Sequence, residues 1–415
     1  MKFYNIAIIL CQFYEATSFT LTQTRAHKSI APSTQLFYLK EETSTTKIQV
    51  GITNNGKTTN HPLVTQQQIP ARISYDKIQD LIDVSRPYYN PKEEAIINNP
   101  TTGALKGFSA SVTPEMPLSY ESGTMNAAEA GRHTAIAGSV AAALLNQEQN
   151  GGTREKHYYL ALDAHLRQEP INSQIFKQFE TIGKPSKKGD AKVFAHATEV
   201  NKRDATAEVY LLTDDNTLWH ITVTYKIIPF KVFDRFFPLS IDPKLTGPWD
   251  PNTPNPYKET INTHIAPQPL AHWNNPTVYH CKSHLRDAIP SMCAGHFDTN
   301  PCFPVAFLCS YLFNIGAESV AELAGVSLPY TRRNKKSAGN KNNQRNSVTI
   351  KELVLDAQTL CMAGTYGLDV DCKTKFNPNH KDGPVYETEI KVTSDCDENH
   401  DVATVKMVYV LNEAK

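Results

Sequence analysis

Apolar residues gather in two long stretches of the chain, residues 123–145 and 304–325, and both have the length and pattern of a buried helix. The second begins at Pro304, which suits a first helical turn because the N–H that proline lacks would be unpaired there. Each stretch is followed by β-branched and aromatic segments with short polar breaks, the pattern of an antiparallel meander. In the first half these segments are 156–165, 191–198, 205–212 and 218–225; in the second half they are 348–360, 364–372, 385–393 and 402–411, with one more strand at 277–285 before the helix.

The order of one helix and then several strands therefore occurs twice, which indicates an internal duplication. A short helix is also predicted at 75–82, where apolar residues recur at helical spacing. A chain of 415 residues suits two domains of ordinary size. We expect four parts: a polar, extended N-terminal segment at 1–69, a first unit at 70–229, a proline-rich linker at 230–276 and a second unit at 277–415.

The charge of the chain is balanced, with 42 basic and 42 acidic residues, so it offers no electrostatic footprint for nucleic acid or an anionic membrane. No segment has the roughly 18 apolar residues that span a bilayer. One basic cluster lies among Ser, Asn and Gly and is typical of a solvated loop, although the phosphates of coenzyme A or a carrier protein would favour the same patch. Its members are Arg332, Arg333, Lys335, Lys336, Lys341 and Arg345.

The eight cysteines form no CxxC pair and no zinc-ligand spacing, so we expect no metal centre. Several, such as Cys309 and Cys361, lie in apolar runs where a free thiol behaves as a small hydrophobic group. Reduced cysteines in a cytoplasmic protein are the favoured interpretation. The alternative is a secreted protein, since residues 1–10 are largely apolar and Ala16-Thr17-Ser18 resembles a cleavage site.

Candidate chemistry lies just before the second helix, where Gly295-His296-Phe297 is followed by Pro301 and Pro304. An imidazole titrates near neutral pH and can act as a base. The first amides of the helix, at Val305 and Ala306, would be free donors at the positive end of the helix dipole. They could receive a polarised carbonyl or enolate oxygen, as a thioester reaction requires.

This segment resembles the active site of the hotdog-fold 3-hydroxyacyl thioester dehydratases, in which His-Phe and a proline five residues after the histidine precede a buried helix. The resemblance implies an α+β fold in which two hotdog units, each a long helix wrapped by an antiparallel sheet, form a fused pseudo-dimer that needs no cofactor. In that family a carboxylate follows fourteen residues after the histidine, where this chain has Ser310. Asp298 and Thr299 replace the usual Pro-Gly, and Val305 replaces a glycine.

The carboxylate that the second half lacks occurs in the first half, as Glu129 in the helical stretch at 123–145. Placing Glu129 on Ser310 aligns the two helices with an offset of 181 residues and puts Glu115 opposite His296. Because the family's catalytic groups come from opposite hotdog units, the resemblance implies one composite site of His296 and Glu129. In it His296 would remove the C2 proton, while Glu129 would protonate the departing hydroxyl.

Two plainer interpretations of these residues stay open. Glu129 could be a helix-surface charge paired with Arg132 or His133, and His133 could be the working imidazole of the first half. At the level of function, three hypotheses follow: a dehydratase or hydratase of carrier-protein or coenzyme A thioesters in fatty acid or polyketide metabolism, a thioesterase in which Glu129 activates water, and a non-catalytic acyl-binding or scaffolding protein. A homodimer of such chains is also compatible with the sequence.

Overall fold

A computed structural model of the chain provides the structure. It describes residues 70–98, 105–150, 156–177, 185, 187–236, 249–259, 261–263, 265–268, 277–285, 290–298, 301–329, 346–358, 367–394 and 401–414. The expected N-terminal extended segment and the basic cluster between Arg332 and Arg345 lie outside these residues.

The first half contains β1 (Pro70–Arg72), α2 (Tyr75–Ile82), β2 (Pro91–Asn98), β3 (Leu105–Val112), α3 (Ala127–Gln149), β4 (His157–Glu169), β5 (Ala191–Val200), β6 (Asp204–Thr213), β7 (Leu218–Pro229) and α5 (Phe230–Phe236). The second half contains η2 (Pro256–Lys258), β8 (Ala266–Pro267), β9 (Val278–Leu285), η3 (Pro290–Cys293), α7 (Val305–Ala324), β10 (Ser347–Ala357), β11 (Leu368–Asn377), β12 (Val385–Ser394) and β13 (Asp401–Asn412). The helices and meander strands predicted from the sequence are present, whereas β2 and β3 were not predicted.

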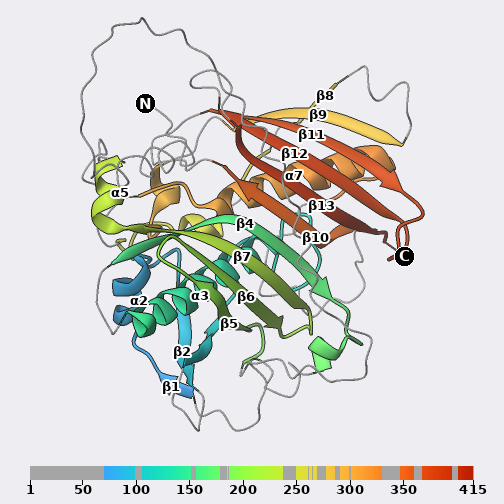
Figure 1. The fold of residues 1–415 in the computed structure, drawn as a ribbon. Coiled ribbons are helices and arrows are strands. Elements are labelled where there is room, and N and C mark those ends of the chain that lie inside the picture. The colour runs from blue at the N-terminus through green and yellow to red at the C-terminus, as the bar shows by residue number, and fades with distance from the viewer. Residues whose placement is uncertain are drawn as a thin grey trace, which may run out of the picture. The chain divides into compact units, whose positions relative to one another are not determined.

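All thirteen described strands form one antiparallel sheet in the order β1-β2-β3-β5-β6-β7-β4-β10-β13-β12-β11-β9-β8. The two halves join where β4 pairs with β10, for example Leu166 opposite Leu353. Helix α3 packs on β3, β5 and β6, and α7 packs on β9 and β11, while the two helices contact each other (Figure 1). Each half is thus a long helix covered by an antiparallel sheet, and the chain is a double hotdog.

The two halves repeat strand by strand: β3, β5, β6, β7 and β4 match β9, β11, β12, β13 and β10 in order. Tyr225 on β7 donates to the carbonyl oxygen of Ala135 in α3 at 2.7 Å, and Tyr409 on β13 donates to that of Phe313 in α7 at 3.1 Å. Each tyrosine hydroxyl lies so close to a helical glycine that a Cβ there would overlap it; the glycines are Gly138 and Gly316.

This repeat corrects the helix alignment expected from the sequence. The first residues of α3 and α7, the two glycines and the left-handed residues Ser119 and Phe297 are all 178 residues apart. The offset of 181 is therefore wrong by three residues, about one helical turn. In the correct alignment Ser310 matches Arg132, and His296 matches Leu118.

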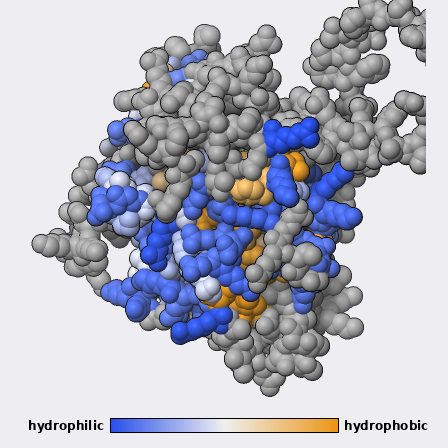
Figure 2. All heavy atoms as spheres, turned by 90° about the vertical axis from the view of Figure 1, so that its left-hand side faces the viewer, coloured by the Kyte–Doolittle hydropathy of each residue, from blue (hydrophilic) through white to orange (hydrophobic). Residues whose placement is uncertain are grey.

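Burial in the strands alternates as a half-covered sheet requires, and α7 is buried over most of its length. Among the described residues, Ile171 and Val354 are the large hydrophobic side chains that are exposed. Among the described residues on the face that Figure 2 shows, hydrophilic ones predominate and hydrophobic ones are seen between them. Of the helices in the described part of the chain, none is long and apolar enough to cross a membrane.

Candidate functional site

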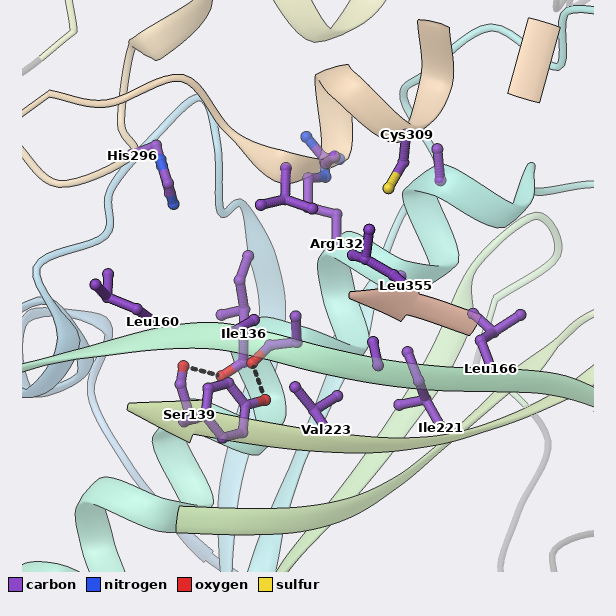
Figure 3. Close-up of a pocket in the computed structure, with 18 of the residues that line it drawn as sticks. Arg132, Ile136, Ser139, Leu160, Leu166, Ile221, Val223, His296, Cys309 and Leu355 are labelled. Atoms are coloured by element: carbon purple, nitrogen blue, oxygen red, sulfur yellow. Dashed lines mark hydrogen bonds between the residues drawn. The ribbon is translucent and has the colours of Figure 1, made fainter. Parts of the chain in front are cut away.

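A cavity of about 120 Å³ lies where the two helices meet the seam of the sheet (Figure 3). Its wall is mostly apolar, with side chains such as Ile136 from α3, Leu160 from β4, Val223 from β7 and Leu355 from β10. No aspartate or glutamate belongs to the described wall. An apolar cavity of this size accepts a hydrocarbon group of several carbons.

His296 is part of this wall and is held in a defined orientation. Its Nδ1 lies 3.0 Å from the carbonyl oxygen of Cys302, and its ring packs against Tyr88 at 4.7 Å and Phe297 at 4.3 Å between ring centres. Burial lowers the pKa of His296 to about 4, so the ring is neutral near pH 7. Because a carbonyl only accepts, we assign the proton to Nδ1, which leaves a lone pair on Nε2.

Sterics explain why the residue before His296 is a glycine. Gly295 has a φ of +77°, and a Cβ there would overlap the backbone of Ser85 and Arg86. The Ser85 amide donates to the Gly295 carbonyl oxygen at 2.8 Å, and the Ser85 hydroxyl donates to Asp298 at 2.6 Å. The segment that carries His296 is therefore fixed against the loop after α2.

The N-terminus of α7 opens on the same cavity. Pro304 at its N-cap makes no side-chain hydrogen bond to the helix, and Val305 and Ala306 line the wall. The first amides of a helix have no partner within the helix, so these two donors can serve a ligand. In α3 the donor that matches Val305 is used by the protein, because Glu121 accepts from the Ala127 amide at 2.9 Å. The N-cap residue Asn126 also accepts from the Glu129 amide at 2.7 Å, whereas Pro304 offers α7 no such side chain.

Glu129 is fully buried and is not among the residues that form the wall. One oxygen accepts hydrogen bonds from the amides of Glu115 and Met116, and it also pairs with Arg132 Nη2 at 3.2 Å. Helical spacing explains the ion pair, since residues 129 and 132 lie one turn apart. The competing interpretation of Glu129 as a charge paired along its helix fits this geometry, although in the interior and not at the surface.

Arg132 is buried beside the cavity and also lines it. Its guanidinium lies over the ring of Tyr257 at 4.8 Å, and its Nε and Nη1 atoms have no hydrogen-bond partner among the described residues. The neighbouring His133 lies 3.3 Å from Arg132 Nη2, and burial together with the arginine charge lowers the pKa of His133. Because a guanidinium only donates, His133 Nε2 is the acceptor in that contact.

The structure therefore brings together His296, Val305, Ala306 and Arg132 of the residues singled out from the sequence. The side chains of Glu129, His133 and Ser310 are buried but are not in the wall of the cavity.

Two aromatic residues at the site were missed by the sequence analysis. Tyr88, which packs on His296, follows α2, and Tyr257, which packs on Arg132, lies in the segment expected to be a linker. Only the unusual density of aromatic residues around Tyr88 and Tyr89 could have signalled the first of them.

Comparisons with known proteins give similar structures but no similar sequences. No protein-family model matches the chain, and no curated protein sequence is significantly similar to it. The TesB protein of Mycobacterium avium subspecies paratuberculosis aligns with a TM-score of 0.35 at 10% identity, over 74% of this chain and 93% of that one. An acyl-ACP thioesterase of Bacteroides thetaiotaomicron aligns with a TM-score of 0.37 at 10% identity, over 73% and 97%. The 12:0-ACP thioesterase of Umbellularia californica aligns with a TM-score of 0.37 at 10% identity, over 74% and 94%. The assignment of the fold rests on the strand order and helix packing of this chain itself.

Proposed function

We propose that the protein hydrolyses acyl thioesters at the cavity between its two helices. The observation that carries the proposal is that a neutral imidazole and an uncapped helix N-terminus line one apolar cavity, with no acidic side chain in its described wall. The apolar wall would hold the acyl group. Coenzyme A or an acyl carrier protein would present the thioester.

In this mechanism His296 Nε2 accepts a proton from a water molecule as the water oxygen attacks the thioester carbonyl carbon. The oxygen of the tetrahedral intermediate takes up negative charge and receives hydrogen bonds from the amides of Val305 and Ala306. The carbon–sulfur bond then breaks, and the imidazolium of His296 returns its proton to the departing thiolate. Cys302 supports the charged ring, because its carbonyl oxygen accepts from Nδ1 in both states.

Hydrolysis suits this site better than dehydration because it needs fewer groups. One base and a set of oxyanion donors suffice, whereas loss of water from a 3-hydroxyacyl thioester also requires an acid for the leaving hydroxyl. The expected acid, Glu129, is bound to two backbone amides and to Arg132. The same geometry disfavours a thioesterase in which Glu129 activates the water, so we assign that role to His296.

Dehydration at a site shared by His296 and Glu129 stays as a second candidate because of one contact. Arg132 lines the cavity and lies 3.2 Å from the Glu129 carboxylate, so that carboxylate is one residue away from the substrate. Rotation of Glu129 toward the cavity would complete the acid–base pair that the resemblance implies. This step would leave the amides of Glu115 and Met116 without their acceptor.

The proposal is tested with purified full-length protein and short acyl-coenzyme A esters. Thiol release is followed with a chromogenic disulfide, and enoyl formation from 3-hydroxybutyryl-coenzyme A is followed by ultraviolet absorbance. We expect thiol release, with kcat/KM reduced about 10²–10⁴-fold in His296→Ala. The matched control is His165→Ala, because His165 is half-exposed on β4 and does not line the cavity.

The other outcomes separate the alternatives. Enoyl formation without thiol release, lost in Glu129→Gln, would replace hydrolysis by dehydration. Neither reaction, together with saturable binding of an acyl-coenzyme A, would make the protein an acyl-binding protein. Full thiol release in His296→Ala would remove the imidazole from the mechanism.

A further inference from the structure

Two cysteines face each other across neighbouring strands of the second unit, far along the sheet from its seam. In the pairing of β9 with β11, Cys281 lies directly opposite Cys372. Both side chains are fully buried free thiols, and each shifts the pKa of the other. Cys372 also donates to the hydroxyl of Ser319 in α7 at 3.7 Å, so the pair lies on the face of the sheet that the helix covers.

The register of this pair meets the geometric requirement for a covalent bond. Residues directly opposite each other in an antiparallel ladder have Cα atoms about 4.5–5.5 Å apart and side chains on the same face. Disulfides join residues whose Cα atoms are about 4.4–6.8 Å apart. The two sulfurs can therefore be joined without a change of strand register.

The other described cysteines do not share this arrangement. Cys293, Cys302 and Cys309 lie in a 3₁₀-helix, in the segment before α7 and in α7 itself, and none is paired in the sheet with another cysteine. Cys302 instead lies 3.5 Å from His296 Nδ1, and Cys309 lines the cavity.

We propose that Cys281 and Cys372 form an intrachain disulfide when the chain folds in the presence of a low-molecular-weight disulfide such as oxidised glutathione. The thiolate of one of the two cysteines attacks one glutathione sulfur and releases one glutathione thiolate. The thiolate of the other cysteine then attacks the protein sulfur of this mixed disulfide and releases the second. Two protein thiols are oxidised, one glutathione disulfide is reduced to two glutathione molecules, and the two thiol protons pass to solvent or to the released thiolates.

Either thiol can attack first, because the contacts that distinguish the two thiols in the folded chain have not yet formed while the chain is folding. Since both groups are buried in the folded chain, the reaction belongs to folding, before the sheet closes over them.

The cross-link would close a loop of about 90 residues that contains α7 and β10. It would join β9 to β11, the strands on either side of α7 in the chain that also pack against this helix. Loop closure of this size raises the midpoint of thermal unfolding by about 5–10 °C when the bond is unstrained. Because neither cysteine lines the cavity, the thioesterase reaction proposed above should be unaffected by the change.

The test is refolding of the full chain in a glutathione redox buffer, followed by blocking of free thiols and peptide mapping without reduction. To prevent exchange with cysteines outside the described residues, we would use a chain with Cys11, Cys361 and Cys396 replaced by serine. We expect one cross-linked peptide pair joining 281 to 372, with a mass two hydrogens below the sum of the reduced peptides. We also expect the higher unfolding midpoint, which is reversed by a reductant.

Matched variants decide the result. Cys281→Ser and Cys372→Ser should each abolish the cross-link and the thermal shift, whereas Cys293→Ser should retain both. Recovery of folded protein with Cys281 and Cys372 still free, or joined to other cysteines, would overturn the proposal. Peptide mapping detects the cross-link without an assay of enzymatic activity. The absence of the disulfide is therefore distinguishable from the absence of thioester hydrolysis.

Discussion

Acidification should destabilise the protein through His296, and the lowered pKa of this buried imidazole gives the direction of the effect and its approximate size. Burial lowers the pKa of the folded-state imidazole to about 4, whereas an unfolded chain has a histidine pKa of about 6.5. Between these pH values the unfolded chain binds a proton at residue 296 and the folded chain does not. The free energy of unfolding therefore falls as the pH decreases from about 6.5 to about 4, and His296 contributes nothing to the pH dependence above that range.

The difference between the two pKa values corresponds to about 3 kcal/mol when complete, at about 1.4 kcal/mol per pKa unit. Urea unfolding of the wild type and of His296→Gln, followed by circular dichroism at about pH 7.5 and pH 4.5, measures it. Other buried groups titrate nearby, since burial raises the pKa of Asp298 to about 6 and that of Glu94 to about 7. Subtracting the pH dependence of the variant from that of the wild type isolates the contribution of residue 296.

We expect the wild type to lose about 2–3 kcal/mol more than the variant over this interval. The half-exposed His165, changed to Gln in the same way, should leave the pH dependence unaltered. If His296 is the catalytic base, kcat/KM should not fall until the pH approaches 4. Equal losses in wild type and His296→Gln, or an imidazole that titrates near 6.5 by NMR, would refute the reasoning.

Three further changes test the packing around the site. Arg132→Met should lower the free energy of unfolding by about 3–5 kcal/mol, because it leaves the Glu129 carboxylate buried without a cation; an unchanged urea midpoint would contradict this. Gly138→Ala should cost about 1–3 kcal/mol by overlap with the Tyr225 hydroxyl, and a double-mutant cycle with Tyr225→Phe should recover part of that cost. Ile136→Phe should fill the cavity and lower kcat/KM at least about tenfold while the protein stays folded; unchanged turnover would place the acyl group elsewhere.

A matched surface change calibrates the first of these measurements. Lys391 pairs with Asp401 at 2.8 Å, and both side chains are exposed, at 55% and 41%. Replacing Lys391 by methionine should change the free energy of unfolding by about 1 kcal/mol or less. A loss as large as that expected for Arg132→Met would show that burial does not set the difference.

The pattern of the sequence predicted the elements whose burial repeats locally. The α7 helix and strands such as β6 and β13 carry their own periodicity, so no distant contact is needed to recognise them. Strand β2 was missed because three of its first four residues are charged, and β3 because it is rich in small residues. Both depend on their partners in the sheet more than on intrinsic preference.

The local pattern of the sequence does not reveal the alignment of the two helices or the contacts of the Glu129 side chain. Helix alignment is set by the contacts of Gly138 with Tyr225 and of Gly316 with Tyr409, which join positions distant in the chain. Matching Glu129 to the position where the resembled family has its carboxylate aligns it with Ser310, and this alignment is displaced by one helical turn. The amides that bind the Glu129 carboxylate come from the segment before α3, and no local pattern reveals them.

The two halves join where β4 pairs with β10, and because they belong to one chain they can differ from each other. Separate subunits that meet by diffusion would assemble into like-with-like pairs as well as mixed ones. A covalent tether raises the local concentration of each half around the other, so the two unlike halves pair with each other. One half was therefore free to close its helix terminus with its own side chains while the other kept an open terminus, and a single gene encodes what would otherwise need two.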